Sequence, residues 1–167
     1  IQMHALMPIP PYIRAGQADI DDNLDYQSQL AEVSGSIAAP TASLHFTQEL
    51  LSQLNKKGIA RELLTLHLGT ASFRSLFEEG ASEVRQPAEE NLIFDDSLIR
   101  KISESKIKGK RLIAVGTSVV RAIESLSLWQ KEGRQFESGA VVPTGLFISP
   151  GHQFLAVEAL ITNFHQP

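Results

Sequence analysis

A strand–turn–helix pattern in the second half of the chain places the strongest limit on its fold. Leu112 to Val115 is a short apolar run, and Gly116-Thr117-Ser118 leads from it into a helix whose apolar positions recur at helical spacing as far as Gly133. Open α/β sheets usually hold anionic or nucleotide ligands at the carboxyl ends of their strands, beside helix N-termini. We therefore expect Thr117 or Ser118 to lie at such a position.

Other segments continue this alternation of strands and helices. The expected helices are a short one through Leu24 and Ala31 that ends near Gly35, one that Thr47 caps and Gly58 ends, and one from Ser97 that carries Leu98, Ile99, Ile102 and Ile107. The other expected strands are Leu63 to Leu68, Thr144 to Ile148 and Phe154 to Thr162, whereas residues 7–13 are expected to be extended and Glu78 to Glu90 to form a surface loop. The chain as a whole, residues 1–167, is predicted to form a single α/β domain with a mixed sheet and flanking helices.

Composition excludes several classes of function. The chain has no cysteine, which rules out disulfides, thiolate metal sites and a cysteine nucleophile. A net charge of -4 argues against non-specific coating of nucleic acid, although one folded RNA can still be recognised locally. No apolar run approaches a membrane span and no secretory signal is visible, so a cytoplasmic protein without a membrane partner is expected.

Three histidines are the candidate proton carriers. His45 precedes a predicted helix, His67 lies inside an apolar strand, and His165 follows the last strand. Imidazole changes charge near neutral pH and can pass a proton. His45 and His67 can equally be buried histidines that bond a backbone carbonyl, and His165 has the same ambiguity, whereas His152 is expected at the surface.

Arg121 and Tyr26 are candidates for binding. Arg121 falls near the start of a predicted helix, an unfavourable end for a cation, so a partner carboxylate or phosphate is expected. This partner is a ligand group, or Glu124 or Glu158 of the chain. Tyr26 and Gln27 can stack on and hydrogen-bond a base, or Tyr26 can belong to the core.

Seven ordered motifs resemble one family, the S-adenosylmethionine:tRNA ribosyltransferase-isomerases of queuosine biosynthesis. They are residues 8–13, Tyr26-Gln27, residues 35–42 with 44–47, Thr65-Leu66-His67-Leu68-Gly69, Ala114-Val115-Gly116-Thr117 with Arg121, residues 146–148 with Pro150-Gly151, and Thr162-Asn163-Phe164-His165. One such motif alone is weak evidence, whereas seven in order across nearly the whole chain form a specific pattern.

The resemblance implies an enzyme that transfers and isomerises the ribosyl group of S-adenosylmethionine onto 7-aminomethyl-7-deazaguanine at the tRNA wobble position, giving epoxyqueuosine. It implies S-adenosylmethionine as co-substrate, no metal, the tRNA anticodon loop as partner, and a monomer or weak homo-oligomer. Under the resemblance His45, His67 and His165 are catalytic. The residues it implies for substrate binding are Tyr26, Gln27, Ser36, Thr41, Gly69, Gly116, Thr117, Ser118, Arg121 and Asn163.

The chain departs from the family pattern in one motif above all. A His-x-Met-His-x-Glu stretch of the family corresponds to residues 84–89, where Val84 and Pro87 replace the two histidines and Glu89 is retained. The resemblance covers roughly half of the family pattern, so an inserted β-barrel domain and a C-terminal extension are expected to be absent from this chain.

Two other hypotheses therefore stand beside the enzyme. One is a catalytically impaired paralogue that binds an adenosyl ligand or RNA without turnover. The other is an α/β domain that serves assembly, with its histidines buried for packing. It predicts that His67→Ala lowers stability and leaves ligand binding unchanged.

Overall fold

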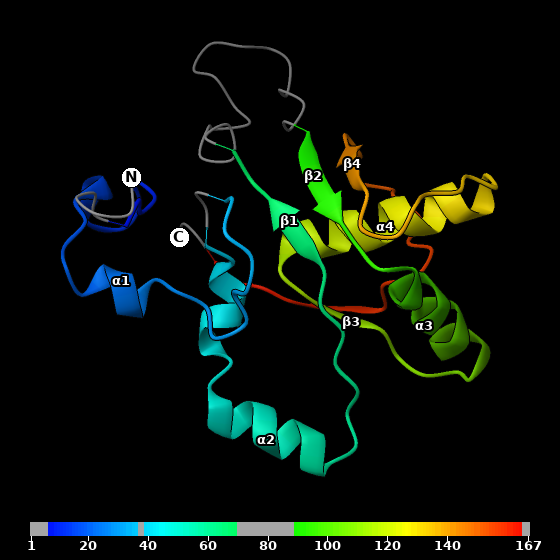
Figure 1. The fold of residues 1–167 in the computed structure, drawn as a ribbon, viewed down its shortest axis with the longest axis horizontal. Coiled ribbons are helices and arrows are strands. Elements are labelled where there is room, and N and C mark those ends of the chain that lie inside the picture. Colours follow the sequence, from blue (N-terminus) through cyan, green and yellow to red (C-terminus); the bar gives the residue numbers. More distant parts are fainter. Residues whose placement is uncertain (1–6, 37–38, 70–88, 165–167) are drawn as a thin grey trace.

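The computed structural model describes residues 7–36, 39–69 and 89–164, which form helices and two small sheets (Figure 1). In chain order the elements are η1 (Arg14–Gly16), α1 (Asp22–Asp25), η2 (Thr41–His45), α2 (Gln48–Lys56), β1 (Thr65–His67), β2 (Glu90–Ile93), α3 (Asp96–Ile107), β3 (Ile113–Val115), α4 (Thr117–Lys131), β4 (Val141–Thr144) and β5 (Ala159–Ile161). This mixture of helices with parallel and antiparallel strands confirms the predicted α/β class.

The two sheets differ in direction. Strands β1, β2 and β4 pair antiparallel in the order β1-β2-β4, whereas β3 and β5 pair parallel. The central strand β2 alternates buried and exposed residues, and Leu92 is fully buried. Pro143 lies in β4, where an edge position tolerates a residue that cannot donate to the ladder.

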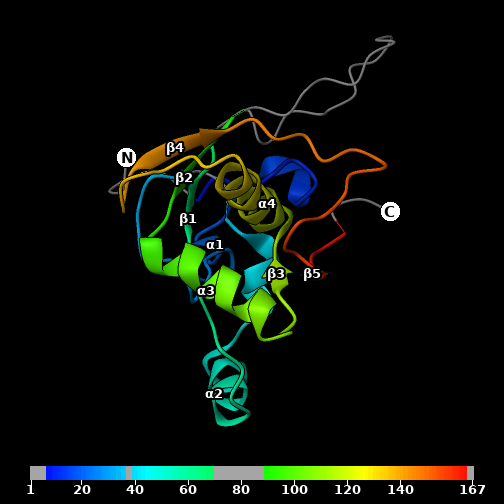
Figure 2. The same cartoon turned by 90° about the vertical axis from the view of Figure 1, so that its right-hand side faces the viewer.

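Helix α4 lies against one face of the antiparallel sheet, as the two perpendicular views agree (Figures 1 and 2). Its buried side includes Val120, Ile123, Leu126 and Trp129, which follow the helical spacing of apolar residues seen in the sequence, whereas Val119 is only partly buried. Together with side chains of β2, α3, β3 and β4 they form one hydrophobic core. Because the rest of α4 packs into this core, its first turn is held in a fixed place.

Helix α2 projects away from the sheets in both views (Figures 1 and 2). Thr47 caps it as predicted, because its hydroxyl oxygen accepts a hydrogen bond from the amide of Leu50 at 3.2 Å. The helix ends before Gly58, whose φ of 70° is a conformation that favours glycine. Leu51 is its buried residue, so α2 is anchored by one side chain of its apolar face.

Several predicted boundaries are wrong. The helix expected through Leu24 and Ala31 is confined to Asp22–Asp25, whereas α3 extends to Ile107 as expected and leaves that residue 85% exposed. The strand expected at Thr144 to Ile148 lies instead at Val141–Thr144, and that expected at Phe154 to Thr162 is shortened to Ala159–Ile161. Glu90, expected in a surface loop, begins β2 and is buried; residues 70–88 lie outside the described part of the chain.

Candidate functional site

The carboxyl ends of the parallel strands meet at the start of α4. The register pairs Val115 with Ile161, and the amide of Gly116 donates to the carbonyl of Ile161 at 2.8 Å. Gly116 adopts φ of 101°, which a residue with a Cβ rarely does, and no side chain caps the helix. The turn therefore presents Thr117 and the positive end of α4 beside the residues that follow β5.

Asn163 and His45 meet at this end of the parallel sheet, although 118 positions separate them in the chain. The Nε2 atom of His45 lies 3.0 Å from Oδ1 of Asn163, and the tautomer decides the donor. His45 ends η2 and is exposed, so it is not a histidine buried for packing. The contact connects the first third of the chain with the residues that follow β5.

Arg121 and Ser118 belong to a buried polar cluster behind this turn. The Nη1 atom of Arg121 lies 3.4 Å from Oε1 of Glu90, and its Nη2 donates to the carbonyl of Thr144 at 2.8 Å. The hydroxyl of Ser118 donates to the same Glu90 oxygen at 3.3 Å. Burial raises the pKa of Glu90, and the nearby charge of Arg121 only partly opposes this.

The carboxylate partner of Arg121 is thus Glu90, and the expectation of Glu124 or Glu158 is wrong. Glu124 is almost fully buried and accepts hydrogen bonds from the amides of Leu155, Ala156 and Val157 at 2.6 to 3.0 Å. Its Oε2 atom also lies 3.6 Å from Nε2 of His152. His152 is therefore half-buried beside α4, whereas a surface position was expected.

His67 lies at the end of β1, the edge strand on the opposite side of the antiparallel sheet from β4, close to Ser36 and Gly69. The Ser36 hydroxyl oxygen accepts from the amide of Leu68 at 3.1 Å, which ties the 35–36 segment to the end of β1. A Cβ atom at Gly35 would lie 2.5 Å from Cε1 of His67, so the ring packs directly on the glycine backbone. Its Nδ1 atom has no hydrogen-bond partner within the described ranges.

Tyr26 is 5% exposed and Gln27 is exposed. Burial, reinforced by the neighbouring Tyr12, raises the pKa of the Tyr26 phenol. Ser28, which follows Gln27, accepts a hydrogen bond from the buried hydroxyl of Ser43 at 2.6 Å, and this bond attaches the segment to η2. Tyr26 is therefore a core residue in this structure, whereas Gln27 is accessible.

The structure thus brings some predicted residues together and leaves others apart. His45 and Asn163 meet beside Gly116 and Thr117, Ser118 joins Arg121, and Ser36 reaches the segment that holds His67 and Gly69. Thr41 opens η2, which ends at His45. Between residues that the structure describes, no hydrogen bond connects His45 with His67 or with Tyr26, and His165 lies outside the described ranges.

Glu90 and Thr144 are the cluster members that the sequence interpretation missed. A usable signal existed for Glu90, because it shares the face of a period-two strand with Leu92. Thr144 pairs with Glu90 across β2 and β4, and this pairing between distant segments leaves no local pattern.

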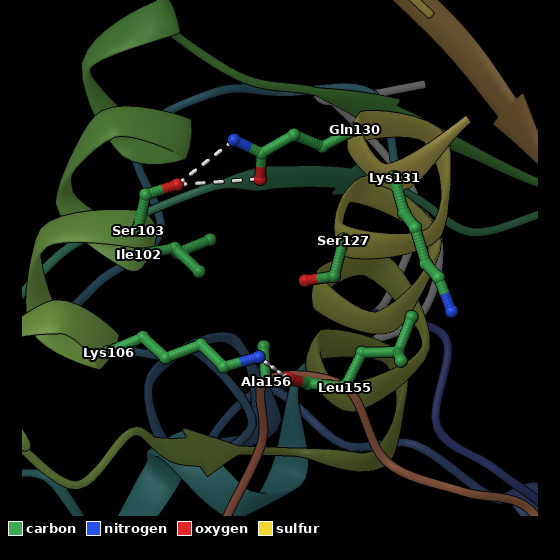
Figure 3. A pocket seen from close by; sticks show the side chains of 8 residues that line it. All are labelled: Ile102, Ser103, Lys106, Ser127, Gln130, Lys131, Leu155 and Ala156. Atoms are coloured by element: carbon green, nitrogen blue, oxygen red, sulfur yellow. Dashed lines mark hydrogen bonds between the residues drawn. The ribbon is translucent and has the colours of Figure 1, made fainter. Parts of the chain in front are cut away.

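A pocket of about 250 Å³ lies elsewhere, between α3, α4 and residues 155–156 (Figure 3). None of the predicted site residues lines it. At one end Lys106 donates to the carbonyl of Leu155 at 2.9 Å, and at the other the Gln130 amide donates to Ser103 at 3.0 Å. The bond between Ser103 and Gln130 therefore connects the two helices, whereas Lys106 connects α3 to the segment that precedes β5.

The described ranges contain no group of three or more His, Cys, Asp or Glu side chains placed to hold a metal ion. Within the same ranges, every helix is too short or too polar to cross a membrane.

Comparison with known proteins gives consistent relatives. The sequence profile of the family described as "Queuosine biosynthesis protein" matches residues 1–167. A protein named S-adenosylmethionine:tRNA ribosyltransferase-isomerase from Erythrobacter litoralis is 41% identical over 162 residues, 96% of this chain and 45% of the relative. One of the same name from Phenylobacterium zucineum is 42% identical over 166 residues, 96% of this chain and 44% of the relative.

A solved structure is also similar. The crystal structure of S-adenosylmethionine tRNA ribosyltransferase from Thermotoga maritima matches with a TM-score of 0.53 and 35% identity, over 75% of this chain and 37% of that one. The chain spans a little less than half the length of the curated relatives it matches.

Proposed function

This chain belongs to the queuosine biosynthesis protein family, and from that premise we propose that it forms part of an S-adenosylmethionine:tRNA ribosyltransferase-isomerase. In the proposed reaction the ribosyl group of S-adenosylmethionine is transferred and isomerised onto 7-aminomethyl-7-deazaguanine at the wobble position of a tRNA. The products are epoxyqueuosine in the tRNA, free adenine and methionine. The names of the relatives support S-adenosylmethionine and tRNA as the two substrates.

The observation that carries the proposal is the contact between His45 and Asn163. The reaction needs a group that removes an acidic proton beside the sulfonium and one that assists the departure of adenine. His45 is exposed, and its ring is oriented by Asn163 at the carboxyl ends of β3 and β5. An oriented, accessible imidazole at this end of a parallel sheet suits proton transfer to a nucleoside.

Thr117 and the first-turn amides of α4 are proposed to bind a polar or anionic part of the substrate, such as the carboxylate of S-adenosylmethionine. Thr117 is exposed, and the positive end of a helix favours a negative group. Gln27 is accessible for a base, and His67 and His165 remain candidate proton carriers. No metal is invoked in these steps.

Release of adenine tests the proposal. The protein is incubated with S-adenosylmethionine and tRNA that carries the aminomethyl deazaguanine, adenine is measured by chromatography, and the modified nucleoside by mass spectrometry. We expect adenine and epoxyqueuosine in equal amounts, an activity decrease of about 100-fold in His45→Ala, and little change in His152→Ala, which lies beside Glu124 instead. No adenine above background with several tRNA substrates would refute the proposal.

Val84 and Pro87 favour one alternative, a protein that binds without turnover. They stand where the family pattern has histidines. Calorimetry that shows binding of S-adenosylmethionine without adenine release would support the alternative. Appearance of activity in Val84→His/Pro87→His would then assign the loss of turnover to these two positions.

A further inference from the structure

Glu90 and Arg121 form an ion pair that is closed off from solvent. Their side chains are 11% and 10% exposed, and the Oε2 atom of Glu90 has no hydrogen-bond partner in the described ranges. The charged or hydroxyl groups that face Glu90 there are Arg121 and Ser118 from α4, with Thr144 paired to it from β4. The pair thus occupies the interface between α4 and the antiparallel sheet.

The contacts of the pair join three elements at one place. Ser118 and Arg121 of α4 bond to Glu90 of β2, and Arg121 also bonds to the carbonyl of Thr144 in β4. One turn further, the hydroxyl of Ser125 lies 2.5 Å from that of Thr144. The N-terminal half of α4 is therefore fixed to the paired residues Glu90 and Thr144, and its first turn cannot shift along the sheet while these bonds hold.

Stability alone is a poor explanation for this arrangement. Burial raises the pKa of Glu90 more than Arg121 lowers it, so keeping this carboxylate ionised lowers the stability of the fold. Packed apolar side chains in place of a buried ion pair are often neutral or stabilising. The charged pair and its directional hydrogen bonds instead hold α4 in one orientation against β2 and β4.

We propose that the Glu90–Arg121 pair positions the first turn of α4 for catalysis, and that Arg121 acts through this turn and not by binding substrate. The inference rests on the proposed function, because the turn carries Gly116 and Thr117 beside His45 and Asn163. Ser118 is the direct link, since its hydroxyl bonds to Glu90. Glu90 and Arg121 are thus positioning residues.

Substitution of Glu90 is the main test. Glu90→Gln keeps the size and an acceptor for Ser118 but removes the charge, and it also removes the cost of burying that charge, so the protein is expected to stay folded. We expect kcat for adenine release to fall about tenfold or more, because small displacements of a site cost large factors in rate. Glu62→Gln breaks the exposed pair with Lys101 and is the matched control, with activity unchanged.

The pH profile separates positioning from a structural role. In the unchanged protein, activity is expected to fall on the acid side as Glu90 takes up a proton and the pair is lost. In Glu90→Gln this decrease should be absent. Arg121→Lys, which keeps the positive charge, should retain more activity than Arg121→Met. Equal profiles for the unchanged protein and Glu90→Gln, or an activity of Glu90→Gln equal to that of Glu62→Gln, would overturn the inference.

Amide exchange keeps this inference separate from the proposed function. The amide of Val120 bonds to the carbonyl of Gly116 at 3.2 Å and reports on the first turn of α4. In Glu90→Gln the Val120 amide is expected to exchange about tenfold faster, while the amides of α2 exchange at unchanged rates. If adenine release fails in the unchanged protein but this difference appears, the proposed function is wrong and the pair still positions the turn. No difference in exchange would overturn positioning whether or not the protein is active.

Discussion

Residues 89–164 and residues 7–63 are held together in different ways. In the first region, buried apolar side chains from β2, α3, β3, α4 and β4 form one continuous core. Among the described residues of the second, few apolar side chains are buried (Ile9, Pro10, Tyr26, Ala42 and Leu51), and polar contacts such as Arg14 with Asp22 and Ser28 with Ser43 connect the segments. The proposed site joins the two, because His45 comes from one and Asn163 from the other. Its geometry therefore depends on how firmly the less packed region is attached.

The largest effect is expected in the core. Leu92→Ala removes a fully buried side chain from the central strand and should lower the free energy of unfolding by about 2–5 kcal/mol. Leu24→Ala in α1 is the control from the other region, since Leu24 is 82% exposed and should change it by about 0.5 kcal/mol or less. Urea denaturation measures both, and similar values for the two would remove the contrast between the regions.

A polar contact should dominate in the other region. Ser43→Ala leaves the buried hydroxyl of Ser28 without its donor, at a cost of about 1–3 kcal/mol. The double variant Ser28→Ala/Ser43→Ala should lose less than the sum of the two single variants, because the two hydroxyls are in direct contact. Strict additivity in denaturation experiments would show that this bond does not hold the segment.

The cap of α2 should have a smaller, local effect. Thr47→Ala removes the acceptor for the amide of Leu50 and should cost about 1 kcal/mol, whereas Thr47→Ser retains the oxygen and should cost little. Because α2 projects from the sheets, faster amide exchange should be confined to α2. Faster exchange in α4 as well would mean that the two regions unfold as one unit.

One acidic residue in each region, Asp22 and Glu90, should contribute to stability with opposite dependence on pH. Hydrogen bonding to the Asp19 amide lowers the pKa of Asp22, so its contribution to stability is present above its unfolded pKa and is lost as pH falls through the folded value. The pKa of Glu90 is raised, so its contribution is present below its unfolded pKa and is lost as pH rises through the folded value. Melting temperatures of Asp22→Asn and Glu90→Gln, each compared with the unchanged protein from pH 3 to 7, should diverge in opposite directions; parallel curves would contradict this.

Local patterns predicted what local forces decide. The cap at Thr47, the end at Gly58 and the passage from β3 through Gly116 into α4 follow from residues within one turn of each other. The family predicted from seven ordered motifs is confirmed.

Tertiary contacts decided the rest. The predicted helix through Leu24 stops at Asp25 because Tyr26 leaves helical geometry and the Ser28 hydroxyl accepts from the amide of Leu30, which competes with a helical bond. The partner of Arg121 was missed because Glu90 reaches it through strand pairing. Likewise β4 contains Pro143, which local propensity disfavours but an edge strand allows.

Calorimetric binding of S-adenosylmethionine to four proteins, the unchanged chain, His45→Ala, Asn163→Ala and the double variant, tests most directly whether the two regions share one site. We expect the unchanged protein to bind, each single variant to bind about tenfold more weakly, and the double variant to bind no more weakly than the single ones, since the contact is already lost. Equal affinity in all four proteins would contradict the account.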